Sequence, residues 1–252
     1  MKLLIDIGNS RIKWVMHGGD ARQGSEIRSL RYQKRRPQEA FSSAWARERR
    51  PEAVYAANVG GAGVGRALER WTRQRWNLAP QYPKVSDRLG GISNGYRRKE
   101  LLGIDRWLAM AGAWARYRQP LCLIDCGTAI TVDVLDREGN HAGGVILPGK
   151  RLLCEALTRG TAQLRNVRFS GPDWALSLGR DTDEAVRFGN CYMIVGALRY
   201  IVAEVRARYG EDIRILFDGG DAAELAGLVG AGSTHAPGLV LEGLAYFAGL
   251  GQ

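Results

Sequence analysis

Two short segments of this sequence place a carboxylate, a glycine and small polar side chains in the same order. They are Asp6-Ile7-Gly8-Asn9-Ser10 and Asp125-Cys126-Gly127-Thr128-Ala129. A glycine leaves an anion free to approach the backbone, and we expect Gly8 to turn the chain with a positive φ. Amide N–H groups at such a turn can bind an oxyanion, and an aspartate can hold Mg²⁺ directly or through water. The pattern predicts phosphate binding at both segments.

Side chains around the first segment offer further contacts to a phosphate. Asn9 and Ser10 are polar donors, and the ammonium of Lys13 can reach back from the outgoing apolar run as a point charge. The sequence contains no GxxxxGK[ST] pattern, which excludes a Walker A loop. Because the glycine leads into a second apolar run rather than a helix, the segment is not a Rossmann fingerprint either.

A further carboxylate could serve phosphoryl transfer, which needs in-line placement, charge neutralisation and a proton acceptor. Asp105, in Gly103-Ile104-Asp105-Arg106-Trp107, follows a glycine and begins an amphipathic stretch. The same carboxylate could instead stabilise a helix N-terminus as a cap or a first-turn acid. The residues alone leave both roles open. Arg106 beside it could pair with a substrate carboxylate.

The two acidic segments belong to an internal repeat, because residues 4–12 align with residues 123–131. Each copy is an apolar strand, a glycine turn and a second strand, which predicts a β-hairpin. The second hairpin is expected to continue into a third, antiparallel strand ending near Ile146. A later strand is predicted at residues 213–217, and helical periodicity is found at residues 106–118, 184–209 and 239–250.

Each half of the chain therefore opens with a hairpin followed by further strands and helices. This organisation predicts a duplicated α/β architecture with a ligand-binding cleft between two lobes. Gly90-Gly91 and Gln119-Pro120 are the best boundary signals. We place the division after residue 118, which gives an N-terminal domain of residues 1–118 and a C-terminal domain of residues 119–252.

The composition is that of a folded protein, since 45% of the 252 residues are hydrophobic. The four cysteines lack the spacing of a zinc site and are expected to be reduced structural thiols. The N-terminus runs directly into a strand, and no apolar stretch approaches the roughly 20 residues that a membrane helix needs. We expect a cytoplasmic protein without membrane contact.

The net charge of +10 is unevenly distributed. Residues 1–118 contain 24 Lys and Arg against 10 Asp and Glu, a charge of +14, whereas residues 119–252 contain 12 against 16, a charge of −4. A basic half suits anionic ligands such as nucleotides, or nucleic acid. The arginine-rich run from Arg28 to Arg50 has few aromatic residues for base stacking, so we expect a solvated surface and no nucleic-acid partner.

Together these motifs resemble those of the type III pantothenate kinases, which belong to the acetate and sugar kinase/Hsp70/actin superfamily. The resemblance covers nearly the whole chain and includes Asn94-Gly95-Tyr96 and Gly143-Gly144-Val145-Ile146-Leu147-Pro148-Gly149. It implies two RNase H-like α/β domains of duplicated actin/hexokinase-type topology with an interdomain cleft. The N-terminal domain would carry the first phosphate hairpin and the pantothenate motif. The C-terminal domain would carry the second phosphate hairpin and the dimerisation helices.

The resemblance implies ATP-dependent phosphorylation of pantothenate to 4'-phosphopantothenate, the first step of coenzyme A synthesis, with Asp105 as the general base. Mg²⁺ would accompany ATP, held through water by Asp6, and K⁺ or NH₄⁺ would bind at Asp125. The enzyme would be a homodimer in which Thr182 reaches the substrate across the interface. ATP binding is implied for Asp6, Ile7, Gly8, Asn9, Ser10, Arg11, Ile12, Lys13 and Thr128, and pantothenate binding for Tyr96, Gly103, Ile104, Asp105, Arg106 and Thr182.

The chain departs from the family pattern at three places. Ser10 replaces the commoner Thr and keeps the hydroxyl, whereas Asp218 adds a carboxylate where Thr is frequent, near the expected adenine site. Residues 57–61 stand where many relatives have a Ser-rich strand end. Two alternatives stay open. One is another small-molecule kinase of the superfamily, which only Tyr96, Asp105, Arg106 and Thr182 oppose, and the other is a non-enzymatic accessory transcription regulator of the same family.

Overall fold

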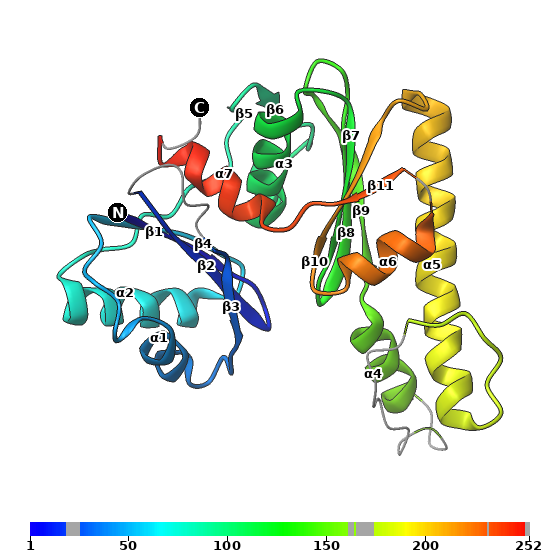
Figure 1. Ribbon diagram of the computed structural model, residues 1–252, viewed down its shortest axis with the longest axis horizontal. Helices are drawn as coiled ribbons and strands as arrows, with labels where there is room; N and C mark the ends of the chain where they lie inside the picture. The colour runs from blue at the N-terminus through cyan, green and yellow to red at the C-terminus, as the bar shows by residue number, and fades with distance from the viewer. Residues whose placement is uncertain (19–25, 161–163, 165–173, 231, 250–252) are drawn as a thin grey trace. The chain divides into compact units, whose positions relative to one another are not determined.

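The computed structural model describes residues 1–18, 26–160, 164, 174–230 and 232–249. The chain divides into two compact units (Figure 1). Unit 1 comprises residues 1–118, residues 139–141 and the C-terminal segment from Gly238, and unit 2 comprises residues 119–138 and 142–237. The sequence predicts a C-terminal domain that runs to residue 252, whereas the structure assigns the segment from Gly238 onward to unit 1.

The sheet of unit 1 has the strand order β3-β2-β1-β4. β1 (Lys2–Ile7) pairs antiparallel with β2 (Arg11–His17) and parallel with β4 (Ala53–Asn58), while β3 (Arg28–Arg31) pairs antiparallel with β2. The first predicted hairpin is thereby confirmed. β1 is central and buried on both faces, so its apolar side chains do not alternate with polar ones: Leu3, Leu4, Ile5 and Ile7 are all fully buried.

Helices cover both faces of this sheet (Figure 1). On one face, α1 (Pro37–Trp45) and α2 (Ala62–Trp76) bury an aromatic cluster in which Trp45 contacts the rings of Trp14, Phe41 and Trp71 at centroid distances of 5.4–5.8 Å. On the other face, α7 (Leu239–Phe247) packs against β1, β4 and α3 (Ile104–Tyr117). Full burial of each large apolar side chain contributes about 1.5–3 kcal/mol.

The backbones of α3 and α7 touch. A Cβ on Gly243 would lie 2.6 Å from the carbonyl carbon of Leu108, and a Cβ on Gly112 would lie 2.8 Å from the Gly243 nitrogen. Glycine is therefore needed on both helices at this crossing. This close packing holds α7 in unit 1. It is the physical reason that α7 does not belong to the C-terminal domain in which the sequence analysis placed it.

A short hairpin and a 3₁₀ turn precede α3. β5 (Arg88–Leu89) and β6 (Ile92–Ser93) pair antiparallel across Gly90 and Gly91, whose φ values are 61° and 93°. The turn η1 (Lys99–Leu101) follows. The glycine pair read from the sequence as a boundary signal is thus a tight turn inside unit 1, since both residues adopt a backbone conformation that favours glycine.

The sheet of unit 2 has the order β11-β10-β7-β8-β9. β7 (Leu121–Cys126) pairs antiparallel with β8 (Ala129–Leu135) and parallel with β10 (Arg214–Gly219), and β10 pairs parallel with β11 (Ser233–His235). β9 (His141–Pro148) lies beside β8. The order β9-β8-β7-β10 repeats β3-β2-β1-β4, which confirms the predicted duplication.

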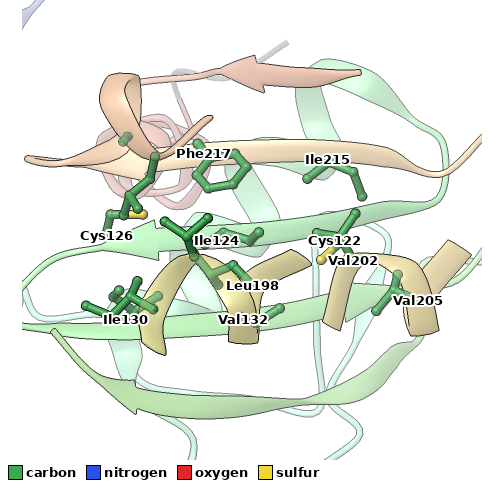
Figure 2. Packing of buried hydrophobic residues seen from close by; sticks show 14 of the residues in the cluster. Cys122, Ile124, Cys126, Ile130, Val132, Leu198, Val202, Val205, Ile215 and Phe217 are labelled. Atoms are coloured by element: carbon green, nitrogen blue, oxygen red, sulfur yellow. The ribbon is translucent and has the colours of Figure 1, made fainter. Parts of the chain in front are cut away.

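The core of unit 2 lies between this sheet and its helices. Figure 2 shows Leu198, Val202 and Val205 of α5 (Thr182–Tyr209) against alternate residues of the strands, because successive strand residues point to opposite faces. α6 (Ala222–Val229) joins this core, and α4 (Lys150–Gly160) packs on α5. All four cysteines lie in the described part of the chain, where each is buried and none is disulfide-bonded.

Within the ranges that the structure describes, none of the helices combines the length and the apolar character needed to cross a bilayer.

Candidate functional site

The first acidic segment forms the turn between β1 and β2. Asp6, which is 9% exposed, pairs in register with Lys13. The Gly8 N–H donates to the Arg11 carbonyl at 2.9 Å and closes the turn. One end of the sheet therefore carries all the residues of this segment that are expected to bind phosphates, namely Asp6, Ile7, Gly8, Asn9, Ser10, Arg11, Ile12 and Lys13.

Gly8 is favoured by its tight surroundings rather than by its backbone conformation. The sequence argument predicts a positive φ, but Gly8 is not among the positive-φ glycines of the described residues, so that prediction is wrong. A Cβ at Gly8 would lie 3.2 Å from the Arg11 carbonyl oxygen, which is tighter than most real Cβ contacts. The missing side chain lets the hairpin close and leaves the backbone accessible to an anion.

A second backbone segment meets this turn at the same end of the sheet. β4 runs parallel to β1 with Asn58 opposite Ile7, and the Val59 N–H donates to the Ile7 carbonyl at 3.0 Å. Asn58 then orders its own loop, because its side chain accepts from the Gly60 N–H at 3.0 Å and donates to the Gly61 carbonyl at 3.1 Å. α2 begins directly after this loop, and the N-terminus of a helix favours negative charge.

Asp105 lies in the first turn of α3 and is partly buried. The N-cap residue of the helix is Gly103, so Asp105 does not occupy the capping position. Its Oδ1 accepts the Arg106 N–H at 2.9 Å. A Cβ on Gly103 would lie 2.5 Å from the same oxygen, so the glycine keeps that side of the carboxylate uncrowded.

Arg106 and Tyr96 meet beside this helix start. Arg106 is buried, its guanidinium donates to the Tyr96 hydroxyl at 2.6 Å, and its Cζ lies 5.5 Å from the Tyr96 ring centre. The His141 ring stacks on Tyr96 at a centroid distance of 5.7 Å. Asn94 fixes the loop by accepting the Tyr96 N–H at 3.0 Å. The structure thus brings together the predicted pantothenate residues of unit 1: Tyr96, Gly103, Ile104, Asp105 and Arg106.

Sequence reasoning missed His141, which lies far along the chain from Tyr96. It reaches unit 1 because the segment from Gly139 docks on β6, where the Ser93 N–H donates to the Gly139 carbonyl at 3.0 Å and the Ser93 hydroxyl donates to Asn140 Oδ1 at 2.7 Å. The sequence shows only a glycine turn at this position. No spacing pattern connects it with Tyr96.

The second acidic segment forms the turn between β7 and β8 in unit 2, where the Gly127 N–H donates to the Ala129 carbonyl at 3.1 Å. The Gly149 N–H donates to the Thr128 carbonyl at 3.2 Å, and a Cβ at Gly149 would lie 2.6 Å from that oxygen. Gly149, the residue between β9 and α4, therefore packs directly on the turn that carries Thr128.

Three aspartates surround Cys126 beside this turn. Burial raises the pKa of the Cys126 thiol, and the charges of Asp125, Asp221 and Asp218 raise that pKa further. The thiol stays protonated and does not act as a nucleophile. Asp218, the departure from the family pattern, is buried opposite Asp125 in the parallel register of β10 and β7, and its Oδ1 accepts the Gly219 N–H at 2.6 Å.

Oxygen atoms suited to a hard cation meet at Asp125. A Cβ at Gly219 would lie 2.7 Å from Asp125 Oδ1 and would collide with the Cys126 carbonyl oxygen. Carboxylate and carbonyl oxygens are the donors that hard cations prefer, so these residues fit a cation. Across the described ranges, no group of three or more His, Cys, Asp and Glu side chains is placed to hold a metal ion.

Thr182 is the first residue of α5. The Asp181 side chain accepts the Glu184 N–H at 2.8 Å and so caps the helix. In return, Glu184 Oε2 accepts the N–H of Arg180, the residue before the cap, at 2.9 Å. A groove of about 770 Å³ runs beside it, and Thr182 and Met193 both line the groove.

The chain is similar to known proteins along nearly its whole length. A family model described as type III pantothenate kinase matches residues 2–204. Proteins of that name from Nitrosococcus oceani and Halorhodospira halophila are each 37% identical over 98% of this chain, covering 94% and 98% of their own lengths. A solved structure from Campylobacter jejuni, assigned to the Baf family of transcriptional activators, has a TM-score of 0.59 at 19% identity and covers 98% of both chains. That likeness shows the fold alone.

Proposed function

The chain belongs to the type III pantothenate kinase family, and from that premise we propose that Asp105 is the general base of its reaction. The enzyme phosphorylates pantothenate in coenzyme A synthesis. The observation that supports the proposal is the position of Asp105, partly buried in the first turn of α3 and adjacent to Arg106, whose guanidinium holds Tyr96.

In the proposed step, the pantothenate hydroxyl gives its proton to Asp105 while its oxygen bonds to the γ-phosphorus of ATP. The bond between the γ-phosphorus and the β,γ-bridging oxygen breaks, and ADP leaves with that oxygen. The protein performs little covalent chemistry in such transfers. Its catalysis comes mainly from placing the two substrates in line and from neutralising the charge on the transferred phosphoryl group. When bound with ATP, Mg²⁺ neutralises phosphate charge, and Asp6 would hold it through water.

The phosphate-binding residues are proposed to be those of the two glycine turns. Asn9, Ser10 and Lys13 in unit 1 offer donors to the phosphates, and Thr128 offers its hydroxyl from unit 2. Arg106 offers charge-assisted hydrogen bonds to the oxygen atoms of pantothenate. Its bond to Tyr96 fixes the guanidinium before substrate arrives, which lowers the entropy lost on binding.

The assignment is tested by ADP release measured against pantothenate and against a panel of sugars and short hydroxy acids. We expect turnover with pantothenate and at least about 100-fold lower kcat/KM with the other acceptors, because a site built for specific hydrogen bonds rejects analogues that lack their partners. Absence of turnover with pantothenate, or equal turnover with a sugar, would support another kinase of the superfamily.

We also propose that a monovalent cation, K⁺ or NH₄⁺, binds at Asp125. Loss of the carboxylate in Asp125→Asn is expected to raise the K⁺ concentration for half-maximal activity by at least about 10-fold, the usual scale for weakening a metal site. The measurement is a K⁺ titration at constant ionic strength. Asp212→Asn is the control, because Asp212 is exposed and pairs with Arg137 elsewhere in unit 2. An unchanged K⁺ requirement in Asp125→Asn would contradict the site.

The enzyme is further proposed to be a homodimer formed through α5. This helix exposes Tyr192, Met193 and Tyr200, and exposed apolar groups of this size mark interaction surfaces. Thr182, beside the groove at the start of the same helix, would then reach the substrate site of the partner. A light-scattering mass equal to the single chain of 27.7 kDa would contradict the dimer.

A further inference from the structure

Tyr32, the residue after β3, holds two carbonyl groups of the phosphate turn in unit 1. Its phenol O–H donates to the Gly8 carbonyl at 2.8 Å, and its backbone N–H donates to the Ser10 carbonyl at 3.3 Å. Nearby, the Lys34 ammonium donates to Asn9 Oδ1 at 2.6 Å. The segment that follows β3, at the edge of the sheet, therefore contacts three successive residues of the turn, Gly8, Asn9 and Ser10.

Each carbonyl that Tyr32 holds shares a planar peptide with the next N–H. In a trans peptide these two groups point in opposite directions, and the described residues contain no cis peptide bond. Fixing the Gly8 carbonyl therefore fixes the Asn9 N–H. That N–H points away from the Tyr32 hydroxyl, where an anion can accept from it. The Arg11 N–H, by contrast, faces β1, because the carbonyl of the same strand residue accepts the Gly8 N–H.

The phenol is confined at this position by its surroundings. A Cβ on Gly60 would collide with the Tyr32 hydroxyl and would lie 3.0 Å from Ile7 Cγ2, so glycine at position 60 provides the space that the phenol occupies. Burial raises the pKa of Tyr32, and the charge of Asp6 raises that pKa further. The hydroxyl therefore remains a protonated donor at neutral pH and above.

We propose that Tyr32 is a positioning residue for ATP, which orients the Asn9 amide donor of the phosphate turn without touching the nucleotide. This inference rests on the proposed binding of ATP phosphates by residues 6–13. It assigns a role in nucleotide affinity to a tyrosine outside the repeated hairpin.

Tyr32→Phe removes the phenol oxygen and keeps the ring. We expect the KM for ATP to rise about 5- to 10-fold, the effect of losing one hydrogen bond to a part-buried carbonyl, while kcat and the KM for pantothenate stay within about twofold. Thermal melting should shift by no more than about 3 °C. A merely structural role would lower the melting temperature and change both KM values together.

Tyr82→Phe is the matched control. The Tyr82 hydroxyl also donates to a backbone carbonyl of unit 1, that of Gly65 at 3.2 Å, and burial raises the pKa of Tyr82 to about 12. Because this bond lies outside the phosphate turn, the KM for ATP should stay within about twofold of the wild type. Equal effects of the two substitutions on that KM would overturn the proposal.

Gly60→Ala tests the same contact without altering Tyr32. The new methyl group displaces the phenol, so the KM for ATP should again rise about 5-fold or more. In the Tyr32→Phe background the collision with the hydroxyl is removed, and only the contacts of the methyl group with Ile7 Cγ2 at 3.0 Å and the Gly8 carbonyl oxygen at 3.2 Å remain. Adding Gly60→Ala there should raise that KM by a clearly smaller factor than in the wild type, because contacting residues are not additive. Full additivity of the two substitutions would overturn the proposal.

Lys13→Met separates failure of this inference from failure of the proposed phosphate site. Removal of the cation beside the turn should raise the KM for ATP about 10-fold or more if the turn binds phosphates. An effect of Lys13→Met without an effect of Tyr32→Phe would overturn only the role of Tyr32. No effect of either would remove the phosphate site from this turn.

Discussion

Asp105→Asn should lower kcat about 10²–10⁴-fold, the usual contribution of a positioned general base. The amide has nearly the shape of the carboxylate but does not take the proton of the pantothenate hydroxyl. Because the amide oxygen of asparagine can still accept the Arg106 N–H in the first turn of α3, the fold should stay intact. The measurement is coupled ADP release at saturating ATP and pantothenate, with melting temperature recorded alongside. We expect kcat and kcat/KM to fall by similar factors, as for an interaction made only in the transition state.

Glu100→Gln is the matched control for this substitution. Glu100 lies on η1, shortly before α3, and its exposed carboxylate pairs with Arg98. Exposed pairs of this kind contribute about 0–1 kcal/mol, so kcat should stay within about twofold of the wild type. Retention of more than about a tenth of wild-type kcat in Asp105→Asn would exclude Asp105 as the base. The carboxylate would then serve only the N-terminal turn of its helix.

Gly243→Ala is expected to destabilise the enzyme by about 2 kcal/mol or more. Overpacking typically costs about 1–3 kcal/mol or more, and here the added methyl group meets the rigid backbone of α3 at Leu108 rather than a side chain that can rotate away. The better helix propensity of alanine recovers at most about 1 kcal/mol. For a protein of this size, a melting temperature lower by about 4–8 °C should result.

Gly227→Ala is the control of opposite sign. Gly227 lies inside α6, and a Cβ there would meet no atom within 4 Å. The same chemical change should therefore stabilise the protein by about 0.5–1 kcal/mol. Urea unfolding of both variants measures the difference in free energy of unfolding. Equal stability of Gly243→Ala and the wild type would show that α3 and α7 separate without cost.

The repeated hairpins could be predicted from the sequence because their information is local. Each Asp-x-Gly follows a run of buried apolar residues. A tight turn at that point brings the next apolar run back beside the first, so the two runs pair as antiparallel strands. The helix that carries Asp105 was predictable for the same reason. Its apolar face, with Trp107 and Met110, recurs at helical spacing.

The remaining features depend on contacts between residues far apart in the chain. Tyr32 and His141 carry no motif, and their roles arise only when β3 and the segment after β8 come beside the hairpin and Tyr96. Glycine also has several uses that look alike in a sequence. Gly8 relieves crowding, Gly90 supplies a positive φ, and Gly243 permits contact between helices.

The return of α7 to the first unit has a consequence for how the polypeptide matures during translation. The ribosome releases residues 1–118 long before it makes the helix that covers β1, β4 and α3. Until that helix emerges, the apolar surface that it later covers is exposed to solvent on the nascent chain. A chain with such an exposed surface is prone to aggregate or to recruit chaperones. Truncation before Gly238 should therefore yield an insoluble product even though it deletes none of the residues proposed to touch substrate.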